Sequence, residues 1–100
     1  MSMRVAINGF GRIGRCVVRN AFLHYPNVFE FVAINDLTDP KTLAHLFKYD
    51  SVHGTFPHEV SHDTESISIN GKKIKIISQK DPALLPWKSM EAGLVLESTG

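Results

Sequence analysis

The chain has 100 residues, of which 43% are hydrophobic and 21% are charged, and its formal net charge is +1. This length allows one small domain, and the near-neutral charge excludes a basic nucleic-acid arm or an acidic tail. A single cysteine excludes an intramolecular disulfide, and the sequence shows neither a secretory hydrophobic region nor an apolar stretch that could cross a bilayer. We therefore expect a cytoplasmic protein.

The first predicted elements are a strand, a glycine-rich turn and a helix. Residues 3–7 form an apolar run that predicts a short buried strand. Residues 9–14 have the pattern Gly-x-Gly-x-x-Gly, and helical spacing then predicts a helix from about residue 12 to about residue 24. The residues expected on its buried face are Ile13, Val17 and Ala21, and those expected away from that face are Arg15, Arg19 and Asn20.

Each glycine of the turn has its own predicted task. Gly9 lets the chain turn sharply, Gly11 lets the backbone approach a diphosphate, and Gly14 lets the helix pack closely against the sheet. The unpaired N–H groups of the first helical turn suit an anion. Asp36, twenty-two residues after Gly14, would accept hydrogen bonds from the ribose hydroxyls of an adenosine, and its charge favours NAD over NADP. The alternative is a purely structural turn, with Asp36 capping the next segment.

A second strand and a second helix follow. Residues 29–35 are almost continuously apolar, which is typical of a parallel strand covered on both faces. Asp39-Pro40 predicts the start of a helix, since proline is tolerated in the first turn, and the helical pattern fades at residues 48–50. The expected buried stripe of this helix is Leu43, Leu46 and Phe47. Residues 51–64 are expected to form a loop.

The clearest signal in the second half of the chain is a β-hairpin. Asn70-Gly71 stands between residues 66–69 and 72–76, and this pair is the one that a two-residue hairpin turn prefers. The turn places Ile67 opposite Ile74. The isoleucines expected on one shared face are Ile67, Ile69, Ile74 and Ile76. The intervening lysines Lys72, Lys73 and Lys75 are expected in solvent, and without interleaved aromatic residues they do not indicate nucleic-acid binding.

The last predicted elements are a short helical turn between Asp81-Pro82 and Pro86-Trp87 and a buried strand at residues 94–96. The order of elements predicts an α/β fold with a Rossmann-type parallel sheet, here the first mononucleotide-binding half plus an antiparallel hairpin. A complete dinucleotide domain uses two such halves. We therefore expect residues 1–100 to be the truncated, amino-terminal part of an NAD-binding domain, with the catalytic domain absent from this chain.

Five blocks of the sequence resemble the start of the phosphorylating glyceraldehyde-3-phosphate dehydrogenase family, in the family's order and at roughly its spacing. The blocks are residues 7–15, 34–36, 48–54, 81–87 and 97–100. The resemblance covers nearly all of this chain and about the first third of the family's length. Erythrose-4-phosphate dehydrogenases are similar over the same blocks but tend to have glutamate in place of Asp36. NADP-using relatives usually lack the Asp36-Leu37 pair, which again favours NAD.

The resemblance implies an oxidoreductase of glycolysis that assembles as a homotetramer. Its substrates would be glyceraldehyde 3-phosphate and inorganic phosphate, its product 1,3-bisphosphoglycerate, and NAD would accept the hydride. The family's catalytic cysteine lies in a Ser-Cys-Thr-Thr-Asn block, which this chain does not contain, so no catalytic residue is assigned. Cys16 is interpreted as a small packing residue of the first helix. The alternatives are an erythrose-4-phosphate dehydrogenase and a stand-alone adenine-nucleotide-binding module without catalysis.

The resemblance also implies a set of cofactor-binding positions. Residues 8–13 would line the diphosphate turn, and residues 35 and 36 would meet the adenosine. The residue at position 80, where the family commonly has arginine, would approach the adenine through its backbone carbonyl, and residues 98 and 99 would lie near the nicotinamide ribose. The complete set is Asn8, Gly9, Phe10, Gly11, Arg12, Ile13, Gly14, Asn35, Asp36, Lys80, Ser98 and Thr99.

No metal site and no membrane partner are expected. His58 and His62 stand four residues apart, but their segment is not helical in pattern and offers no third ligand. His24, His45 and His53 are expected to be surface or capping residues.

Overall fold

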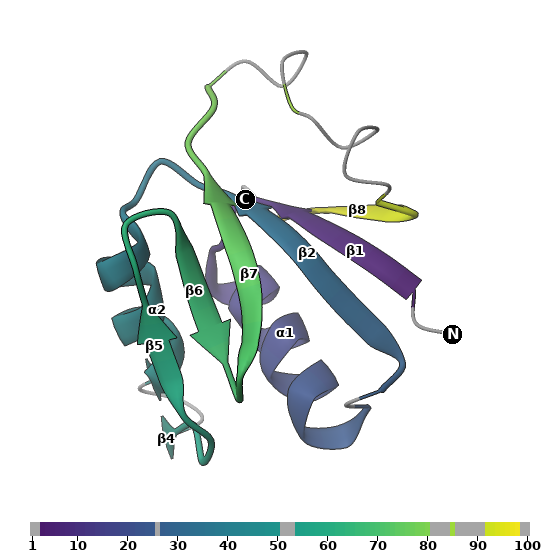
Figure 1. Cartoon of the computed structure of the whole chain (residues 1–100). Helices are drawn as coiled ribbons and strands as arrows, with labels where there is room; N and C mark the ends of the chain where they lie inside the picture. Colours follow the sequence, from purple (N-terminus) through teal and green to yellow (C-terminus); the bar gives the residue numbers. More distant parts are fainter. Residues whose placement is uncertain (1–2, 26, 51–53, 81–84, 86–91, 99–100) are drawn as a thin grey trace.

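The computed structural model describes residues 3–25, 27–50, 54–80, 85 and 92–98. Its elements, in chain order, are β1 (Met3–Asn8), α1 (Arg12–His24), β2 (Phe29–Asn35), α2 (Pro40–Lys48), β3 (Tyr49–Asp50), β4 (Gly54–Thr55), β5 (Val60–His62), β6 (Ser66–Ile69), β7 (Lys72–Ile77) and β8 (Leu94–Glu97). In the described part of the chain, six strands form one sheet in the order β5-β6-β7-β2-β1-β8, and β3 pairs with β4 separately. Both helices cover the same face of the larger sheet (Figure 1).

The parallel part of the sheet confirms the predicted α/β architecture. Strand β1 pairs in parallel with β2 on one side and with β8 on the other, and β2 pairs in parallel with β7. The predicted strand, helix and strand of the first half therefore stand in the expected places. The prediction that Asp39-Pro40 begins α2 is also confirmed, because Asp39 accepts a 2.8 Å hydrogen bond from the backbone N–H of Thr42. Hydrogen bonding from Thr42 lowers the pKa of Asp39 below its ordinary value.

The predicted hairpin is confirmed residue by residue. Ile67 lies opposite Ile74, and the turn residues Asn70 and Gly71 have φ angles of 51° and 81°. Positive φ at both central positions is what a type I′ turn requires. Just before β6, the backbone N–H of Glu65 donates to the Asp63 carboxylate and lowers the pKa of Asp63 to about 2.

The prediction of a loop over residues 51–64 is wrong in part. Residues 54–55 form β4, and residues 60–62 form β5, which extends the hairpin by pairing antiparallel with β6. Strands of two and three residues are too short for an alternating pattern to be recognised in the sequence. Residues 51–53, and with them His53, lie outside the described residues, as does the helical turn predicted near residues 81–87.

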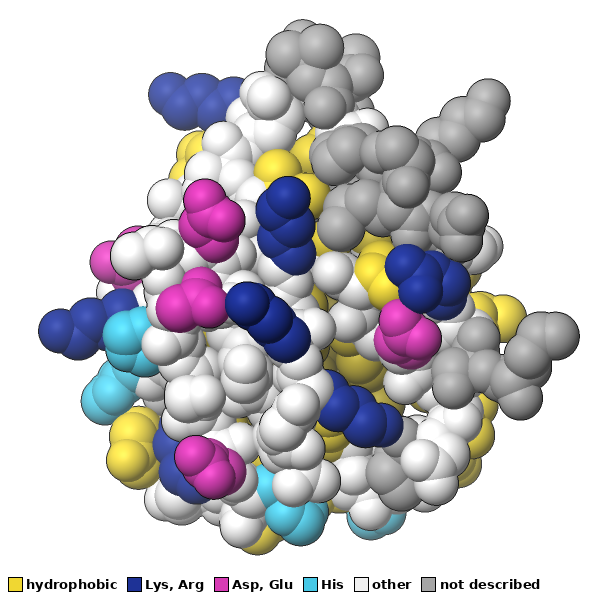
Figure 2. All heavy atoms as spheres, viewed as in Figure 1, with side chains coloured by type: hydrophobic (Ala, Val, Ile, Leu, Met, Phe, Trp, Pro, Cys, Tyr) yellow, Lys and Arg dark blue, Asp and Glu magenta, His cyan; other side chains and the backbone are white. Residues whose placement is uncertain are grey.

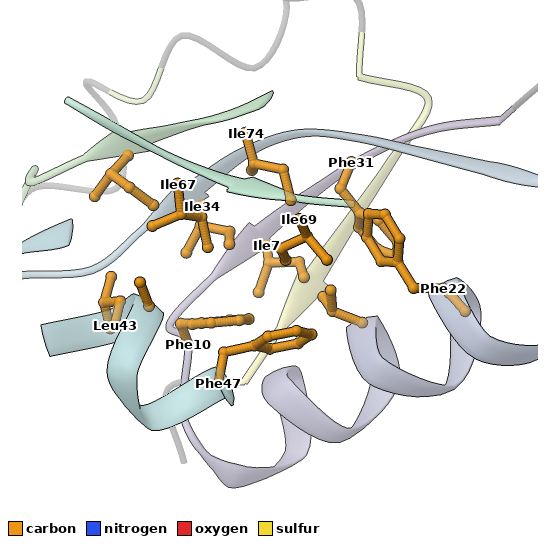
Figure 3. Packing of buried hydrophobic residues seen from close by; sticks show 14 of the residues in the cluster. Ile7, Phe10, Phe22, Phe31, Ile34, Leu43, Phe47, Ile67, Ile69 and Ile74 are labelled. Atoms are coloured by element: carbon orange, nitrogen blue, oxygen red, sulfur yellow. The ribbon is translucent and has the colours of Figure 1, made fainter. Parts of the chain in front are cut away.

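The core lies between the sheet and the two helices. Figure 3 shows Ile7, Ile34 and Ile74 extending from neighbouring strands towards the helical layer, where Phe10 and Phe47 lie. The rings of Phe10 and Phe47 stack with their centroids 6.0 Å apart. Because Phe10 belongs to the glycine turn and Phe47 to α2, this contact ties the turn to the second helix.

The predicted buried face of α1 is wrong by about one residue. Ile13 is 67% exposed and Val17 is half-buried, whereas the helix buries Val18 and Phe22 against the sheet. Ala21 is buried, as predicted. Gly14, near the amino end of the helix, packs closely against Ser98, which follows β8 in the chain, and the local pattern carries no information about that distant contact.

The prediction that Arg19 points away from the core is wrong. Its side chain is only 8% exposed, donates a 2.9 Å hydrogen bond to the carbonyl of Gly54, and lies 5.4 Å from the ring centroid of Phe56. These partners follow it in the chain by more than thirty positions. In α2, Leu46 was predicted to be buried but is 39% exposed, and Ala44 is buried instead.

The opposite face of the sheet carries charged side chains. Figure 2 shows Lys, Arg, Asp and Glu side chains spread over the face turned to the viewer. Lys72, Lys73 and Lys75 are exposed, as predicted for the outward positions of the hairpin. Strand β8 was predicted to be buried, but Leu94 is 43% exposed, because β8 forms the edge of the sheet in the described part of the chain. No helix within the described ranges is long and apolar enough to span a membrane.

Candidate nucleotide-binding site

A cleft of about 600 Å³ opens where the parallel strands end. In the sheet register, Asn8 of β1 lies beside Asn35 of β2 on one side and Glu97 of β8 on the other, so the carboxyl ends of these strands meet at one edge. The cleft is lined by Asn8, Gly9, Gly11, Asn35, Asp36, Leu37, Gln79, Lys80, Glu97 and Ser98. Ligands of open α/β sheets bind outside the carboxyl ends of the strands. The position of the cleft therefore agrees with the site predicted from the glycine turn.

The glycine turn forms one wall of the cleft. Gly9 has a φ of 89°, a left-handed conformation that glycine adopts without strain. Gly11 is the N-cap residue of α1, and because glycine has no side chain it makes no capping hydrogen bond of its own. Because Gly11 lines the cleft, the amino end of α1 and the positive end of its helix dipole lie beside the cleft. This arrangement suits a diphosphate.

Two of the glycines are also required by close packing. A Cβ atom at Gly14 would lie 2.6 Å from Ser98 Oγ and 3.0 Å from the carbonyl oxygen of Gly9. A Cβ atom at Gly11 would lie 3.2 Å from the carbonyl oxygen of Ser98. The predicted task of Gly14, to let the helix approach the sheet, is therefore confirmed, and the neighbours that it approaches include Ser98, which directly follows β8.

Asp36 lies at the tip of β2 and faces the glycine turn. Its Oδ2 accepts a 2.8 Å hydrogen bond from the backbone N–H of Phe10, and its Oδ1 accepts a 2.9 Å hydrogen bond from the N–H of Thr38. In the described part of the chain, the ion pairs are those of Arg4 with Glu30 and Lys73 with Asp63, so Asp36 is not engaged in one. Each carboxylate oxygen can accept a further hydrogen bond, which leaves capacity for ribose hydroxyls.

A chain of polar side chains forms the floor of the cleft. Asn8 Nδ2 donates to both carboxylate oxygens of Glu97, at 2.9 and 3.1 Å, and Asn8 Oδ1 accepts from Asn35 Nδ2 at 2.9 Å. The side chain of Asn35 also holds the backbone of Gln79, through one donated and one accepted hydrogen bond of 3.0 and 2.9 Å. Sequence reasoning missed Glu97, Gln79 and Leu37 as lining residues. Each of them lies within three residues after a predicted strand, and this was the signal that could have identified them.

Only some of the other predicted site residues line the cleft. The side chain of Phe10 is buried in the core, so only its backbone borders the turn. Arg12 and Ile13 are exposed on the first turn of α1 and do not line the cleft. Thr99 lies outside the described residues. The members of the predicted set that the structure brings together around the cleft are Asn8, Gly9, Gly11, Asn35, Asp36, Lys80 and Ser98.

Cys16 and two of the histidines, all within the described residues, lie outside this cleft. Cys16 is half-buried on α1 and does not line the cleft. His24 and His45 are exposed, as predicted, and the ring of His45 lies 4.9 Å from that of Tyr49. Among the residues that the structure describes, no group of three or more His, Cys, Asp or Glu side chains could hold a metal ion.

Comparison with known proteins gives a consistent result. The family model "Glyceraldehyde 3-phosphate dehydrogenase, NAD binding domain" matches residues 3–100. The chain is 54% identical to a glyceraldehyde-3-phosphate dehydrogenase of Pseudomonas aeruginosa, and the match covers 100% of this chain and 30% of the relative. It is 56% identical to the enzyme of that name from Thermotoga maritima, over 97% of this chain and 29% of the relative. It is 58% identical to glyceraldehyde-3-phosphate dehydrogenase 1 of Bacillus cereus, over 97% of this chain and 28% of the relative. The chain thus spans less than a third of the length of these relatives.

Proposed function

The chain belongs to the glyceraldehyde 3-phosphate dehydrogenase family and carries its NAD binding domain, and we propose that the cleft at the carboxyl ends of β1, β2 and β8 is the NAD site. The observation that carries this proposal is the pair formed by Asp36 and the amino end of α1. The Asp36 carboxylate at the tip of β2 and Gly11, the N-cap residue of α1, line the same cleft. One suits a ribose diol and the other a diphosphate, which are the two polar parts of an adenosine diphosphate.

Each part of the site has a defined role in this proposal. The N–H groups of the first turn of α1 and the backbone of Gly9 and Gly11 would bind the diphosphate. Asp36 would bind the adenosine ribose and, by its charge, disfavour the 2′-phosphate of NADP. Lys80 would border the adenine and Ser98 the ribose nearer the nicotinamide. The same assignment extends to Asn8, Phe10, Arg12, Ile13, Gly14, Asn35 and Thr99 as the residues that build or flank these surfaces.

For the protein at its natural length, we propose the reaction after which its relatives are named. NAD, when bound, accepts a hydride from glyceraldehyde 3-phosphate, and inorganic phosphate becomes bonded to the oxidised acyl carbon, which gives 1,3-bisphosphoglycerate. This chain would supply cofactor binding, and a catalytic cysteine and histidine would be supplied from outside residues 1–100. We extend the proposal to a homotetramer in the cytoplasm, on the family resemblance and on the presence of a single cysteine.

Isothermal titration of NAD and NADP into the protein and an Asp36→Asn variant tests the cofactor site. The variant keeps the size of the side chain but removes its charge and one acceptor. Loss of hydrogen bonds to a charged group should weaken NAD binding by about tenfold or more, since such bonds contribute about 1.5–3 kcal/mol. NADP should lose much less affinity, because the like charge is removed. The ratio of NAD affinity to NADP affinity separates loss of the charge at the ribose from distortion of the glycine turn. A merely distorted turn would weaken the binding of both cofactors equally.

Asp39→Asn is the matched control, because Asp39 is a nearby carboxylate that caps α2 and does not line this cleft. It should leave both affinities unchanged. An unchanged NAD to NADP ratio in Asp36→Asn would contradict the ribose assignment. NADH formation by the protein at its natural length, from glyceraldehyde 3-phosphate and phosphate and compared with erythrose 4-phosphate, tests the reaction. NAD binding without turnover of either sugar phosphate would favour a binding module.

A further inference from the structure

A side chain continues the pairing of β2 with β7 beyond the ends of the two strands. The last paired residues are Asn35 and Ile77, and the N–H of Asp36 donates to the carbonyl of Ile77 at 2.8 Å. Beyond them, Asn35 Nδ2 donates to the carbonyl of Gln79 at 3.0 Å, and Asn35 Oδ1 accepts from the N–H of Gln79 at 2.9 Å. A carboxamide offers one donor and one acceptor, as the backbone of a neighbouring strand does. We call these two bonds the Asn35 clamp.

The groups that orient the Asn35 side chain belong to the protein itself. The backbone N–H of Gln79 can only donate and its carbonyl can only accept, so together they fix which way the amide of Asn35 is turned. The second hydrogen of the NH₂ group is donated to Asn8 Oδ1 at 2.9 Å. Both donors are thus in use, and the residue is only 7% exposed. Asn35 therefore serves the cleft by holding backbone in place, and its NH₂ group is not available to a ligand.

Asn35 borders two walls of the cleft through two different groups. On the side of β1, its backbone carbonyl accepts the N–H of Gly9 at 2.7 Å, which joins it to the glycine turn. On the side of β7, its side chain holds Gln79, which is followed by Lys80, and both of these residues line the cleft. A substitution at position 35 removes the clamp but keeps the backbone carbonyl to which Gly9 donates. The two walls can therefore be tested separately.

The order of the strands indicates which part of a nucleotide would meet the wall formed by Gln79 and Lys80. In the sheet, β2 lies between β1 and β7. The proposed ribose site, Asp36, follows β2, and the proposed diphosphate site, the glycine turn, follows β1. In a nucleotide, the base and the diphosphate are attached on opposite sides of the ring oxygen of the ribose. The base would therefore extend from Asp36 over the end of β7, where Gln79 and Lys80 line the cleft.

We propose that Asn35 is a positioning residue of the nucleotide cleft, and that its clamp holds Gln79 and Lys80 where they meet the base. This inference rests on the proposed NAD site and deepens it. A residue that positions the wall does so without ligand, and its loss affects binding of the base and not of the diphosphate. A residue that only contacts the ligand leaves the free wall unchanged. A residue that only stabilises the fold affects every part of the cleft alike.

The first test is hydrogen exchange without ligand, measured by mass spectrometry on the protein at its natural length. In Asn35→Ala, the segment that contains Gln79 and Lys80 should exchange at least about fivefold faster, because the hydrogen bonds of the clamp are lost. The glycine turn should keep its exchange rate, since Gly9 still donates to the carbonyl of residue 35. Unchanged exchange in the segment with Gln79, or an equal rise in the glycine turn, would overturn the proposal.

Two further variants guard this test against a general loss of structure. Asn8→Ala is the matched control, because it removes another largely buried asparagine from the cleft but leaves both bonds of the clamp in place. It should leave exchange in the segment with Gln79 unchanged, and a rise as large as in Asn35→Ala would contradict the positioning role. Asn35→Asp keeps the size of the side chain but cannot donate to the carbonyl of Gln79. If Asn35→Ala does not fold, Asn35→Asp decides the question by the same criteria.

The second test is titration calorimetry with NAD and with inorganic diphosphate. Asn35→Ala should weaken NAD binding by about three- to tenfold, the range expected for losing the order given by one ordinary hydrogen bond. It should leave the affinity for inorganic diphosphate unchanged, because the clamp does not hold the glycine turn. Asn20→Ala is the matched control, since Asn20 is an exposed asparagine of α1 that does not line the cleft, and it should change neither affinity. Unchanged NAD affinity in Asn35→Ala, or equal losses for the two ligands, would overturn the proposal.

The two tests separate this inference from the proposed function. If the unchanged protein does not bind NAD, the proposed function fails, while the exchange of the segment with Gln79 still decides whether Asn35 holds the wall. If NAD binds and that exchange is the same in Asn35→Ala as in the unchanged protein, the proposed function stands and the positioning role of Asn35 is refuted.

Discussion

Replacing Gly14 with alanine should destabilise the fold and weaken nucleotide binding. The added methyl group would lie 2.6 Å from Ser98 Oγ, 3.0 Å from the carbonyl oxygen of Gly9 and 3.4 Å from Ile7 Cγ2. The first two separations are shorter than van der Waals contact. The Ser98 hydroxyl donates to the carbonyl of Gly9, so it cannot rotate away without losing that bond. The Gly9 oxygen is part of the backbone, so relief of this contact requires the turn or the helix to move.

Two effects oppose each other at this position. Alanine is favoured over glycine inside a helix by about 1 kcal/mol, whereas an added methylene in a well-packed site costs about 1–3 kcal/mol. Because one of the close atoms at Gly14 is backbone, we expect the packing cost to dominate, with a net loss of about 1–2 kcal/mol. Since Gly9, Gly11 and Ser98 all line the cleft, a displacement of the turn or of Ser98 should also lower NAD affinity.

Urea denaturation measures the first effect and titration calorimetry with NAD the second. Gly93→Ala is the control, because its added Cβ would find its nearest neighbour, the carbonyl oxygen of Arg4, at an ordinary 3.7 Å. Adding Ser98→Ala to Gly14→Ala removes the hydroxyl but leaves the Gly9 carbonyl in place, so only part of the stability should return. Gly14→Ala with wild-type stability would refute the reasoning, and full recovery in the double variant would show that the backbone contact does not matter.

Two further predictions concern the hairpin. Gly71 has a φ of 81° and open space where a Cβ would stand, so Gly71→Ala should lower the free energy of unfolding by about 1–2 kcal/mol through backbone strain alone. Urea denaturation of this variant, compared with Gly93→Ala, measures the loss. Equal stability of the two variants would contradict the prediction. The pKa of Asp63 is about 2 rather than 3.8, so its contribution to stability is present above pH 3.8 and is lost as the pH falls through about 2. Asp63→Asn should therefore make the loss of stability over this range shallower in thermal melts at a series of pH values, and an unchanged profile would count against the assignment.

The elements that could be predicted are those whose cause is local in sequence. The hairpin follows from Asn70-Gly71, because the two residues that adopt positive φ also fix which isoleucines pair. The start of α2 follows from Asp39 and the proline after it. In both cases the deciding interaction joins residues no more than a few positions apart, so the sequence pattern contains it.

Which residues of α1 are buried depends on contacts with residues far away in the sequence, and the prediction of the buried face was wrong. Arg19 is buried because Gly54 and Phe56 meet its guanidinium, and these residues follow it by more than thirty positions. The local pattern treats an arginine as an outward residue, since its charge must be compensated when it is buried. Similarly, Gly14 packs closely against Ser98, far along the chain, and its neighbour Ile13 lies in solvent.

The residues that line the cleft likewise include some that local sequence predicts and some that depend on distant contacts. Gly9, Gly11 and Asp36 were found because the spacing of a strand, a turn and a second strand is a regular feature of the chain. Glu97 was missed because its contact with Asn8 joins residues 89 positions apart, and the contact of Asn35 with Gln79 joins residues 44 positions apart. Such polar contacts follow from the order of strands in the sheet, which the predicted elements alone did not give.

Asp36 shows how the predicted and the unpredicted parts of the site act together. From its place in the sequence it was expected to meet a ribose, but its Oδ2 also accepts the N–H of Phe10 and so holds the glycine turn against the tip of β2. The carboxylate that would select the cofactor therefore also shapes the surface that would bind the diphosphate. For this reason the affinity for NAD alone cannot identify its role in selection. The ratio between NAD and NADP can, because shaping the turn affects both cofactors alike and only the charge at the ribose distinguishes them.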